Sequence, residues 1–198
     1  MKTNNNETFQ KILDIGMQLV QERGYNGFSY ADIAEAVGIR KASIHYYFPT
    51  KQELVQAVLL RYRKHFIEKL DQIDKSSSDA KEKLKGFFKV YRDTLEDNSK
   101  ICLCSMMAAE LNSFPEEIRN ELTLFFRANE EWVENVLKQG INSGSLTIRS
   151  TDEVKQAKII VAFVQGAQLL ARSTGEIDYF DSLTKDFYDD FKVDDTAN

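Results

Sequence analysis

The chain has 198 residues, of which 42% are hydrophobic and 29% are charged, and its formal net charge is −5. This composition is typical of a globular protein with a sizeable core, and the acidic balance excludes nucleic-acid binding through overall positive charge. Charged residues interrupt every apolar stretch and the first residues lack an apolar signal core, so we expect no membrane partner and a cytoplasmic location.

The first predicted helix runs from about residue 7 to 23, after a frayed tail at 1–6. Apolar residues recur along it at the spacing of one helical face. Gly24 follows it, and glycine readily takes the left-handed backbone that ends a helix. We expect this helix to brace the two helices that come next.

Residues 29–51 predict two short helices joined by a tight turn, which is a helix-turn-helix. Ser29 and Asp32 have the spacing of a capping box at the start of the first helix. Gly38 ends that helix for the same reason as Gly24. The second helix is predicted over 41–47.

The second of these helices has an anchored side and a free side. Ile44 and Phe48 are four residues apart and face the first helix, and no acidic residue occurs between Glu35 and Glu53. An acid-free stretch with basic, hydroxyl and aromatic side chains suits a phosphate backbone and a major groove. The sequence therefore predicts binding to double-stranded DNA. The residues predicted on the free side are Arg40, Lys41, Ser43, His45, Tyr46 and Tyr47.

A long helix is predicted from Thr50 to about residue 73. Thr50 and Glu53 form a second capping box at its start. Lys51 lies in its first turn, where the backbone N–H groups and the positive end of the helix dipole favour a phosphate. The same helix must connect to the rest of the protein, so movement of its far end would tilt the DNA-binding helices.

The rest of the chain is predicted to be helical as well. Residues 74–79 are small and polar and mark a composition shift. Further helices are expected near 79–96, 100–112, 116–143, 151–173 and 177–191. The prediction is an all-α protein of about nine helices, with a three-helix DNA-binding domain at 1–51 and an effector-binding and dimerisation domain at 52–198.

An effector cavity is one interpretation of the apolar residues in the second domain. The segment 101–111 is apolar almost all round, which predicts a buried helix, and its methionines can adapt to variable guests. Aromatic residues from other helices would line an apolar cavity with few polar groups. The alternative is an ordinary packed core. The residues predicted to bind an effector are Phe87, Tyr91, Cys102, Met106, Phe126, Trp132, Phe163 and Gln168.

The last two predicted helices carry apolar faces that favour a homodimer. Ile159, Leu170, Phe180 and Phe187 belong to these faces, and Gly166 permits close helix approach. The alternative is that both faces are used within one chain. A dimer suits the short DNA-binding helix, because two copies on a twofold axis contact a palindromic operator.

Residues that could carry chemistry are few. Cysteines two residues apart rarely form a structural disulfide in a helix, and the two histidines of the chain lie far from Cys102 and Cys104. No catalytic triad, carboxylate pair or metal cluster is evident. The sequence therefore predicts no enzyme, no cofactor and no metal site. Glu110 lies in the apolar segment and needs a partner, for which Arg127 or Arg172 is predicted.

Residues 24–54, with the sequence G-Y-N-G-F-S-Y-A-D-I-A-E-A-V-G-I-R-K-A-S-I-H-Y-Y-F-P-T-K-Q-E-L, resemble the TetR family of bacterial transcriptional regulators. The resemblance covers about the first quarter of the chain. It implies a dimeric repressor that a small apolar or electrophilic effector releases from DNA. The family usually has Ser or Thr before its DNA-binding helix, whereas this chain has Arg40, which weakens the cap and adds a charge.

The resemblance also implies roles for individual residues. Phosphate contacts are implied for Arg40, Lys41, His45, Tyr46, Tyr47 and Lys51, and contacts to base edges or nearby backbone for Tyr30, Ala42 and Ser43. The pattern C-L-x-x-x-x-x-A-E resembles a subgroup that senses electrophiles or oxidants through a cysteine, here Cys102. The alternative for Cys102 is a small buried hydrophobe. The alternative function is a DNA-binding architectural or cell-division factor without an effector.

Overall fold

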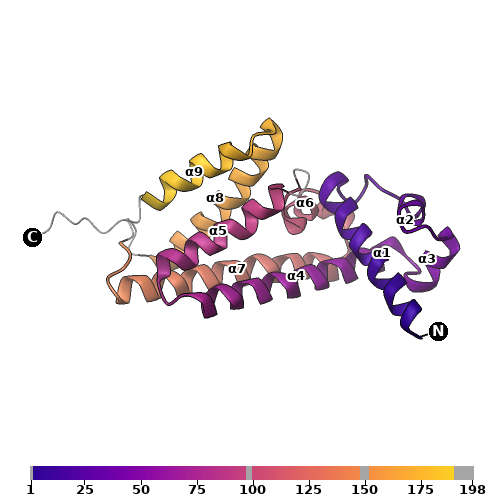
Figure 1. Cartoon of the computed structure of the whole chain (residues 1–198), viewed down its shortest axis with the longest axis horizontal. Helices are drawn as coiled ribbons and strands as arrows, with labels where there is room; N and C mark the ends of the chain where they lie inside the picture. The colour runs from indigo at the N-terminus through magenta and orange to yellow at the C-terminus, as the bar shows by residue number, and fades with distance from the viewer. Residues whose placement is uncertain (1, 97–99, 148–151, 190–198) are drawn as a thin grey trace, which may run out of the picture. The chain divides into compact units, whose positions relative to one another are not determined.

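The computed structural model describes residues 2–96, 100–147 and 152–189, and these residues form nine α-helices, one short 3₁₀ helix and no strand (Figure 1). The prediction of an all-α protein is confirmed. The elements are α1 (Lys2–Arg23), α2 (Tyr30–Val37), α3 (Lys41–Tyr47), α4 (Lys51–Ser76), α5 (Ala80–Glu96), α6 (Leu103–Ala109), η1 (Leu111–Ser113), α7 (Glu116–Asn142), α8 (Glu153–Thr174) and α9 (Ile177–Asp189).

Two of the predicted boundaries were wrong. Helix α1 begins at Lys2, so the polar stretch predicted to be a frayed tail is helical. Helix α6 has seven residues instead of the thirteen predicted for 100–112. Cys102 precedes it with φ −47° and ψ 126°, and Glu110 ends it with φ −111° and ψ 26°. The predicted end of the last helix, at 190–191, lies outside the described residues.

Two compact units make up the chain, and contacts within each define them. The first contains Met1–His65 and Cys102–Thr123, and the second contains Phe66–Ile101 and Leu124–Asn198. Helices α4 and α7 each pass from one unit into the other. The predicted domain boundary after residue 51 does not coincide with this division and stays a prediction.

In the first unit, helix caps fix the local structure that the sequence predicts. The Ser29 hydroxyl accepts a hydrogen bond from the Ala31 N–H, and the Ser29 N–H donates to Asp32 Oδ2 over 2.7 Å. The Ser29 hydroxyl also donates to Asp32 Oδ2 over 2.7 Å, and this bond and the one from the Ser29 N–H hold the pKa of the Asp32 carboxyl below its ordinary value. Gly24 and Gly38 take φ values of 74° and 75°, as expected for glycines that end helices.

In the second unit, aromatic rings and a buried polar network fill the core. Phe66 packs against Tyr91 and Phe125, with ring centroids 5.5 and 5.0 Å apart. The Tyr91 hydroxyl donates to Asn129 Oδ1 over 3.0 Å, and Gln168 Nε2 donates to the Tyr91 carbonyl over 2.8 Å. Polar groups in this core therefore have hydrogen-bond partners, as buried polar groups require.

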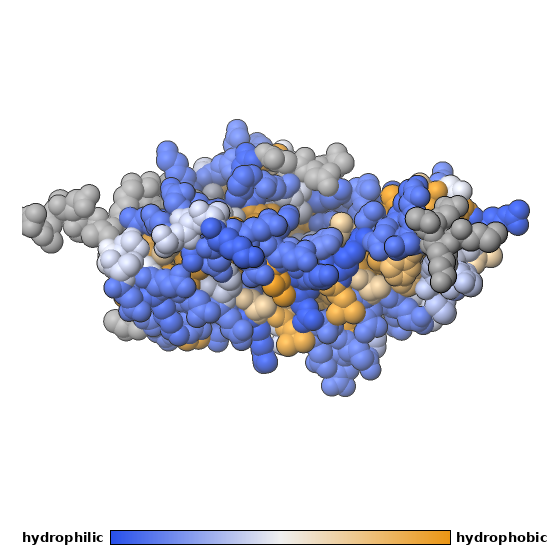
Figure 2. Space-filling view, turned by 60° about the horizontal axis from the view of Figure 1, so that its bottom comes forward, coloured by the Kyte–Doolittle hydropathy of each residue, from blue (hydrophilic) through white to orange (hydrophobic). Residues whose placement is uncertain are grey.

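A further feature of the chain is the hydropathy of its surface and of its helices. Figure 2 shows a face on which hydrophilic residues predominate and hydrophobic residues appear in smaller groups. Among the described residues, no helix combines the length and the hydropathy that a membrane span requires.

Candidate nucleic-acid interface

Helix α3 is anchored on one side and exposed on the other. Ile44 and Phe48 are 0% and 5% exposed, so both lie in the core of the first unit. Lys41, Ala42 and His45 are exposed on the opposite side. Tyr46 is the most exposed aromatic residue of this helix, at 76%. The structure therefore presents one face of a short helix to solvent, as the sequence predicts.

Positive charge at the start of α3 is not neutralised within the chain. Arg40 is the N-cap residue, and its side chain makes no capping hydrogen bond. Within the described part of the chain, neither Arg40 nor Lys41 has a carboxylate at ion-pair distance. Two exposed, unneutralised cations beside an uncharged helix face can bind phosphate groups.

The aromatic residues at the end of α3 are held by their neighbours. His45 Nδ1 lies 3.2 Å from the Pro49 carbonyl oxygen, and the His45 ring packs edge-on against Tyr30 with centroids 4.8 Å apart. Tyr47 is half-buried and lies against Phe9 of α1, with centroids 6.2 Å apart. These contacts limit the rotamers of His45 and Tyr47, so the exposed face is pre-organised.

Tyr30, predicted to touch base edges or nearby backbone, lies in the core of the first unit. Its side chain is 5% exposed, and its hydroxyl donates to the Phe48 carbonyl over 2.8 Å. Burial, with smaller contributions from the Glu53 charge and Tyr25, raises the pKa of Tyr30 to about 12. Tyr30 therefore ties the start of α2 to the end of α3.

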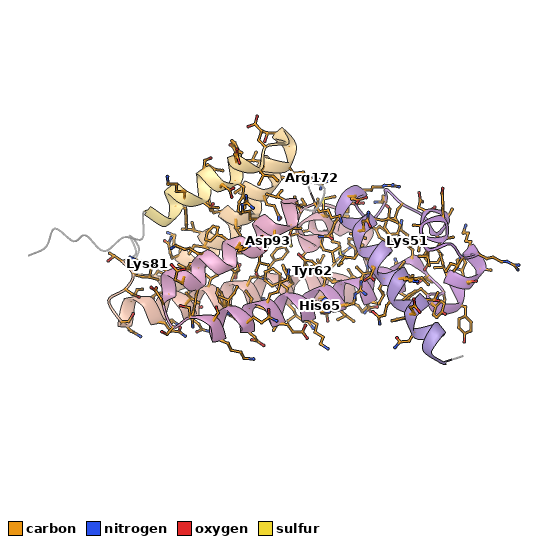
Figure 3. The ribbon with its side chains drawn as sticks, in the orientation of Figure 1. Lys51, Tyr62, His65, Lys81, Asp93 and Arg172 are labelled. Carbon is orange, nitrogen blue, oxygen red and sulfur yellow. The ribbon has the colours of Figure 1, made fainter. Side chains whose placement is uncertain are left out.

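Lys51, predicted to bind a phosphate, forms its hydrogen bonds inside the first unit. Its ammonium group donates to the carbonyls of Tyr25 and Phe28. It lies 4.6 and 4.0 Å from the centroids of the same two rings. Burial lowers the pKa of Lys51, although the charges of Glu110 and Asp32 oppose this shift. Figure 3 labels Lys51 at this position in the first unit.

Glu110 forms contacts that the sequence prediction missed. Its carboxylate accepts hydrogen bonds from the backbone N–H of Tyr25 over 2.7 Å and of Asn26 over 3.1 Å, and from Asn26 Nδ2 over 2.5 Å. The partners predicted for it were Arg127 and Arg172, and neither is among these donors. Backbone N–H groups of a distant loop satisfy this carboxylate instead.

The thiols of Cys102 and Cys104 lie together in the first unit and are fully buried. Burial raises the pKa of the Cys102 thiol. Hydrogen bonds involving Cys104, Tyr62 and Ser105 outweigh burial and lower the Cys102 pKa to about 6. Burial and the Cys102 thiolate raise the pKa of Cys104. Tyr62, labelled on α4 in Figure 3, thus links α4 to the start of α6.

The residues predicted to bind an effector are divided between the two units. Cys102 and Met106 belong to the first unit, whereas the other six belong to the second. In the second unit, Phe87 stacks on Trp132 with centroids 5.6 Å apart, and Phe163 stacks on Phe187 at 4.4 Å. Gln168 is fully buried and bonded to Tyr91. For these residues the packed-core alternative agrees better with the structure.

Two further predicted effector residues lie at edges of the packing. Phe126 is partly buried and contacts Phe125, with ring centroids 5.4 Å apart. Trp132 borders a surface groove of about 300 Å³, and its indole N–H donates to Asp74 over 2.9 Å. The other residues of this groove are Asn135, Val136, Lys138, Gln139 and Asn142, so its lining is mainly polar. This groove does not match the predicted apolar cavity.

Helices α8 and α9 use part of their apolar faces within the chain. Ile160, Val164 and Phe180 are buried in the second unit, as the single-chain alternative predicts. Other apolar side chains of α8 stay exposed in the single chain: Val154, Ile159, Leu169 and Leu170, at 44%, 43%, 56% and 49%. Exposed apolar side chains gathered on one helix are candidates for a subunit contact.

Comparisons with known proteins find similar sequences over most of the chain. A family model for bacterial regulatory proteins of the tetR family matches residues 12–58, and one for a tetracyclin repressor-like C-terminal domain matches residues 80–187. The transcriptional repressor DhaR of Mycobacterium sp. (strain GP1), described as HTH-type, is 28% identical, over 86% of this chain and 87% of its own length.

Solved structures give the same result. A TetR-family transcriptional regulator from Agrobacterium tumefaciens has a TM-score of 0.91 and 33% identity, covering 96% of this chain and 100% of that chain. A TetR transcriptional regulator from Legionella pneumophila has a TM-score of 0.81 and 35% identity, covering 90% and 94%.

Replacing Tyr30 by Phe tests how much the buried hydrogen bond from the Tyr30 hydroxyl contributes to stability. The free energy of unfolding at pH 7 should fall by about 1–3 kcal/mol, because the buried Phe48 carbonyl loses its donor. The folded-state pKa of Tyr30 is raised from 10.0 to about 12, so its contribution is complete below pH 10 and is lost as the pH rises through 12. Urea unfolding of both proteins between pH 7 and 11.5 measures the difference, which should shrink above pH 10.

Tyr46→Phe is the matched control, because it removes a hydroxyl from an exposed residue of the same unit. Its unfolding free energy at pH 7 should stay within about 0.5 kcal/mol of the parent value. A Tyr30→Phe protein as stable as the parent at every pH would contradict the tie between α2 and α3.

Proposed function

Because the chain belongs to the TetR family of bacterial regulatory proteins, we propose that it is a cytoplasmic transcriptional repressor that binds a palindromic operator as a homodimer. The observation that carries this proposal is the exposed face of α3, which has two unneutralised cations and no carboxylate. Relatives named as repressors, including DhaR, support repression in preference to activation. The family consists of regulators, in agreement with the prediction that the chain is not an enzyme.

The proposed contacts divide into positioning and specificity. Arg40 and Lys41 bind phosphates at the start of α3, and His45, Tyr46 and Tyr47 contact the adjacent backbone. Ala42 and Ser43 lie on the first turn of the helix, from which short side chains reach base edges in the major groove. Tyr30 and Lys51 are excluded from the contact set because their polar groups are bonded within the unit.

Replacing Lys41 by Ala tests the phosphate contact. The operator is first selected from a random duplex library, which should yield a palindrome. The variant should bind this operator and an unrelated duplex more weakly by similar factors, and the slope of log K against log salt should lose about 1. Fluorescence anisotropy at several salt concentrations measures both quantities.

Lys75→Ala is the control for Lys41→Ala. Lys75 is exposed in the last turn of α4, so its removal makes the same change in net charge away from α3. Its affinity and salt slope should match those of the parent protein. If Lys41→Ala also matched the parent, Lys41 would leave the contact set.

The proposed dimer forms through the exposed apolar residues of α8 together with α9. Leu170→Asp should shift the protein from twice the chain mass to the chain mass, because a carboxylate replaces an apolar side chain in the contact. Leu124→Asp is the matched control, since Leu124 is 45% exposed on α7, close to the 49% of Leu170. Sedimentation velocity at micromolar concentration measures the mass, and a dimeric Leu170→Asp protein would contradict this interface.

The proposal for release has two forms, a reversible effector and modification of Cys102. In the second, the Cys102 sulfur adds to the activated double bond of an electrophile, and its proton goes to the neighbouring carbon. Both thiols are buried, so this addition requires the start of α6 to open. Release then follows because the adduct prevents α6 from closing against Tyr62 of α4.

Treatment with N-ethylmaleimide tests the thiol form of release. The parent protein should lose operator affinity by at least about tenfold, the change that 1.4 kcal/mol of differential binding produces, and mass spectrometry should place the adduct on Cys102. Cys102→Ala should bind DNA and resist the reagent, whereas Cys104→Ala should remain sensitive. Unmodified Cys102 in protein released by the reagent would remove the thiol form. Affinity indifferent to every small molecule and oxidant would favour the architectural or cell-division alternative.

A further inference from the structure

The loop at residues 24–28, between α1 and α2, is held by two opposite charges. The Lys51 ammonium donates hydrogen bonds to the carbonyls of Tyr25 and Phe28. The Glu110 carboxylate accepts hydrogen bonds from the backbone N–H groups of Tyr25 and Asn26. We call Lys51, Glu110 and the backbone of residues 24–28 the charged clamp. It satisfies the polar backbone of a loop that leads directly into the helix-turn-helix.

Gly24 shows how closely Glu110 approaches this loop. A β-carbon at this position would lie 2.1 Å from Glu110 Oε1, and the backbone φ is 74°, which is strained for any other residue. The side chain of Asn26 adds a hydrogen bond from its Nδ2 to Glu110 Oε2 and another to the Ser113 hydroxyl over 3.2 Å. The absence of a side chain at Gly24 and the donors of Asn26 therefore make room for the carboxylate and bind it.

The two ends of α6 meet different parts of the first unit. Cys102 is the N-cap residue, with hydrogen bonds to Tyr62 of α4, and Glu110 is the C-cap residue in the charged clamp. Helix α6 has only seven residues, so it is about 10 Å long and two turns separate the thiols from the clamp. A displacement at one end of so short a helix reaches the other end.

We propose that Glu110 is a positioning residue that transmits the state of α6 to the helix-turn-helix through the N–H groups of Tyr25 and Asn26. The inference rests on the proposed function. When α6 opens at Cys102, Glu110 leaves the loop, and the loop no longer holds α2 and α3 at one angle to α1. DNA affinity then falls although Glu110 itself does not touch DNA.

Replacing Glu110 by Gln tests the proposal with little change in shape. Only one side-chain oxygen remains, and the new NH₂ group faces donors of Asn26. Removing one or two hydrogen bonds to a charged group should weaken operator binding by about tenfold or more. The decisive quantity is the ratio of dissociation constants with and without N-ethylmaleimide, which should fall from at least about tenfold in the parent to within about twofold in the variant.

Glu117→Gln is the matched control. Glu117 is exposed in the first turn of α7, in the same unit, and its removal makes the same change in net charge. It should keep the parent affinity and the parent ratio. If Glu110 only stabilised the fold, Glu110→Gln would bind more weakly in both states and would keep the ratio, and this outcome would overturn the proposal.

Hydrogen exchange provides a readout that does not depend on DNA. Exchange of the Tyr25 and Asn26 amides should accelerate in Glu110→Gln and in the parent protein after alkylation, but not in Glu117→Gln. Asn26→Ala keeps both backbone N–H groups and should show a smaller acceleration, which tests the clamp if Glu110→Gln fails to fold. Amides equally protected before and after alkylation of Cys102 would overturn the coupling.

The failures of the two proposals are distinguishable. If the parent protein binds no duplex, the proposed function fails, and if it binds but its affinity ignores alkylation, only the thiol form of release fails. In both cases the exchange measurement still decides whether Glu110 follows α6. If the parent binds and responds, and Glu110→Gln responds equally, the proposed function stands and the role of Glu110 fails.

Discussion

The charged clamp is the constraint on which the first unit depends. A loop between two helices leaves backbone N–H and C=O groups without helical partners, and a partly buried loop cannot leave them to water. Here a cation supplies donors to the carbonyls and an anion supplies acceptors to the N–H groups. Because Lys51 starts α4 and Glu110 ends α6, the loop is fastened to two helices outside the helix-turn-helix itself.

Local charge on the DNA-binding helix differs from the charge of the whole chain. The net charge is −5, yet the face of α3 carries Arg40 and Lys41 without ion-pair partners in the described residues. In the sequence, Lys51 extends this basic patch. In the structure its ammonium group donates a hydrogen bond to the Tyr25 carbonyl, so the patch is smaller than the sequence indicates. In the proposed complex, fewer cations make the electrostatic, salt-dependent part of the DNA affinity smaller. Contacts of α3 with the bases and the pairing of two copies then contribute a larger part.

The sequence predicted the parts of the structure that depend on near neighbours. The capping residues Ser29 and Thr50 and the helix-ending Gly24 and Gly38 act over four residues or fewer, and all four lie where expected. Amphipathic spacing likewise predicted the burial of Ile44. These features are local, so composition and spacing are sufficient to find them.

The contacts that the sequence did not reveal join residues that are distant in the sequence. Tyr30 bonds a carbonyl 18 residues away, Lys51 bonds carbonyls 26 and 23 residues away, and Glu110 bonds N–H groups 85 and 84 residues away. In the sequence, a hydroxyl or a charged group near a DNA-binding helix suggests a contact with DNA. Only the tertiary fold shows that the group forms a hydrogen bond with a backbone group of the same unit. The shortness of α6 was missed similarly, because its apolar character predicts burial but not where the backbone leaves the helix.

The two halves of the charged clamp differ in how readily each can move. Lys51 belongs to a helix of 26 residues whose first turn is capped by Thr50, and burial of its neighbours Leu54 and Val55 fixes that turn in the core. Glu110 is the C-cap residue of a helix of only seven residues. Short helices are marginal on their own and depend on tertiary contacts, so α6 is the weaker anchor of the loop. If Glu110 withdrew, Lys51 would keep its carbonyl acceptors while the N–H groups of Tyr25 and Asn26 lost theirs. The loop would then be held on one side only, and a change in a short, partly buried helix would alter the angle of a DNA-binding helix elsewhere in the unit.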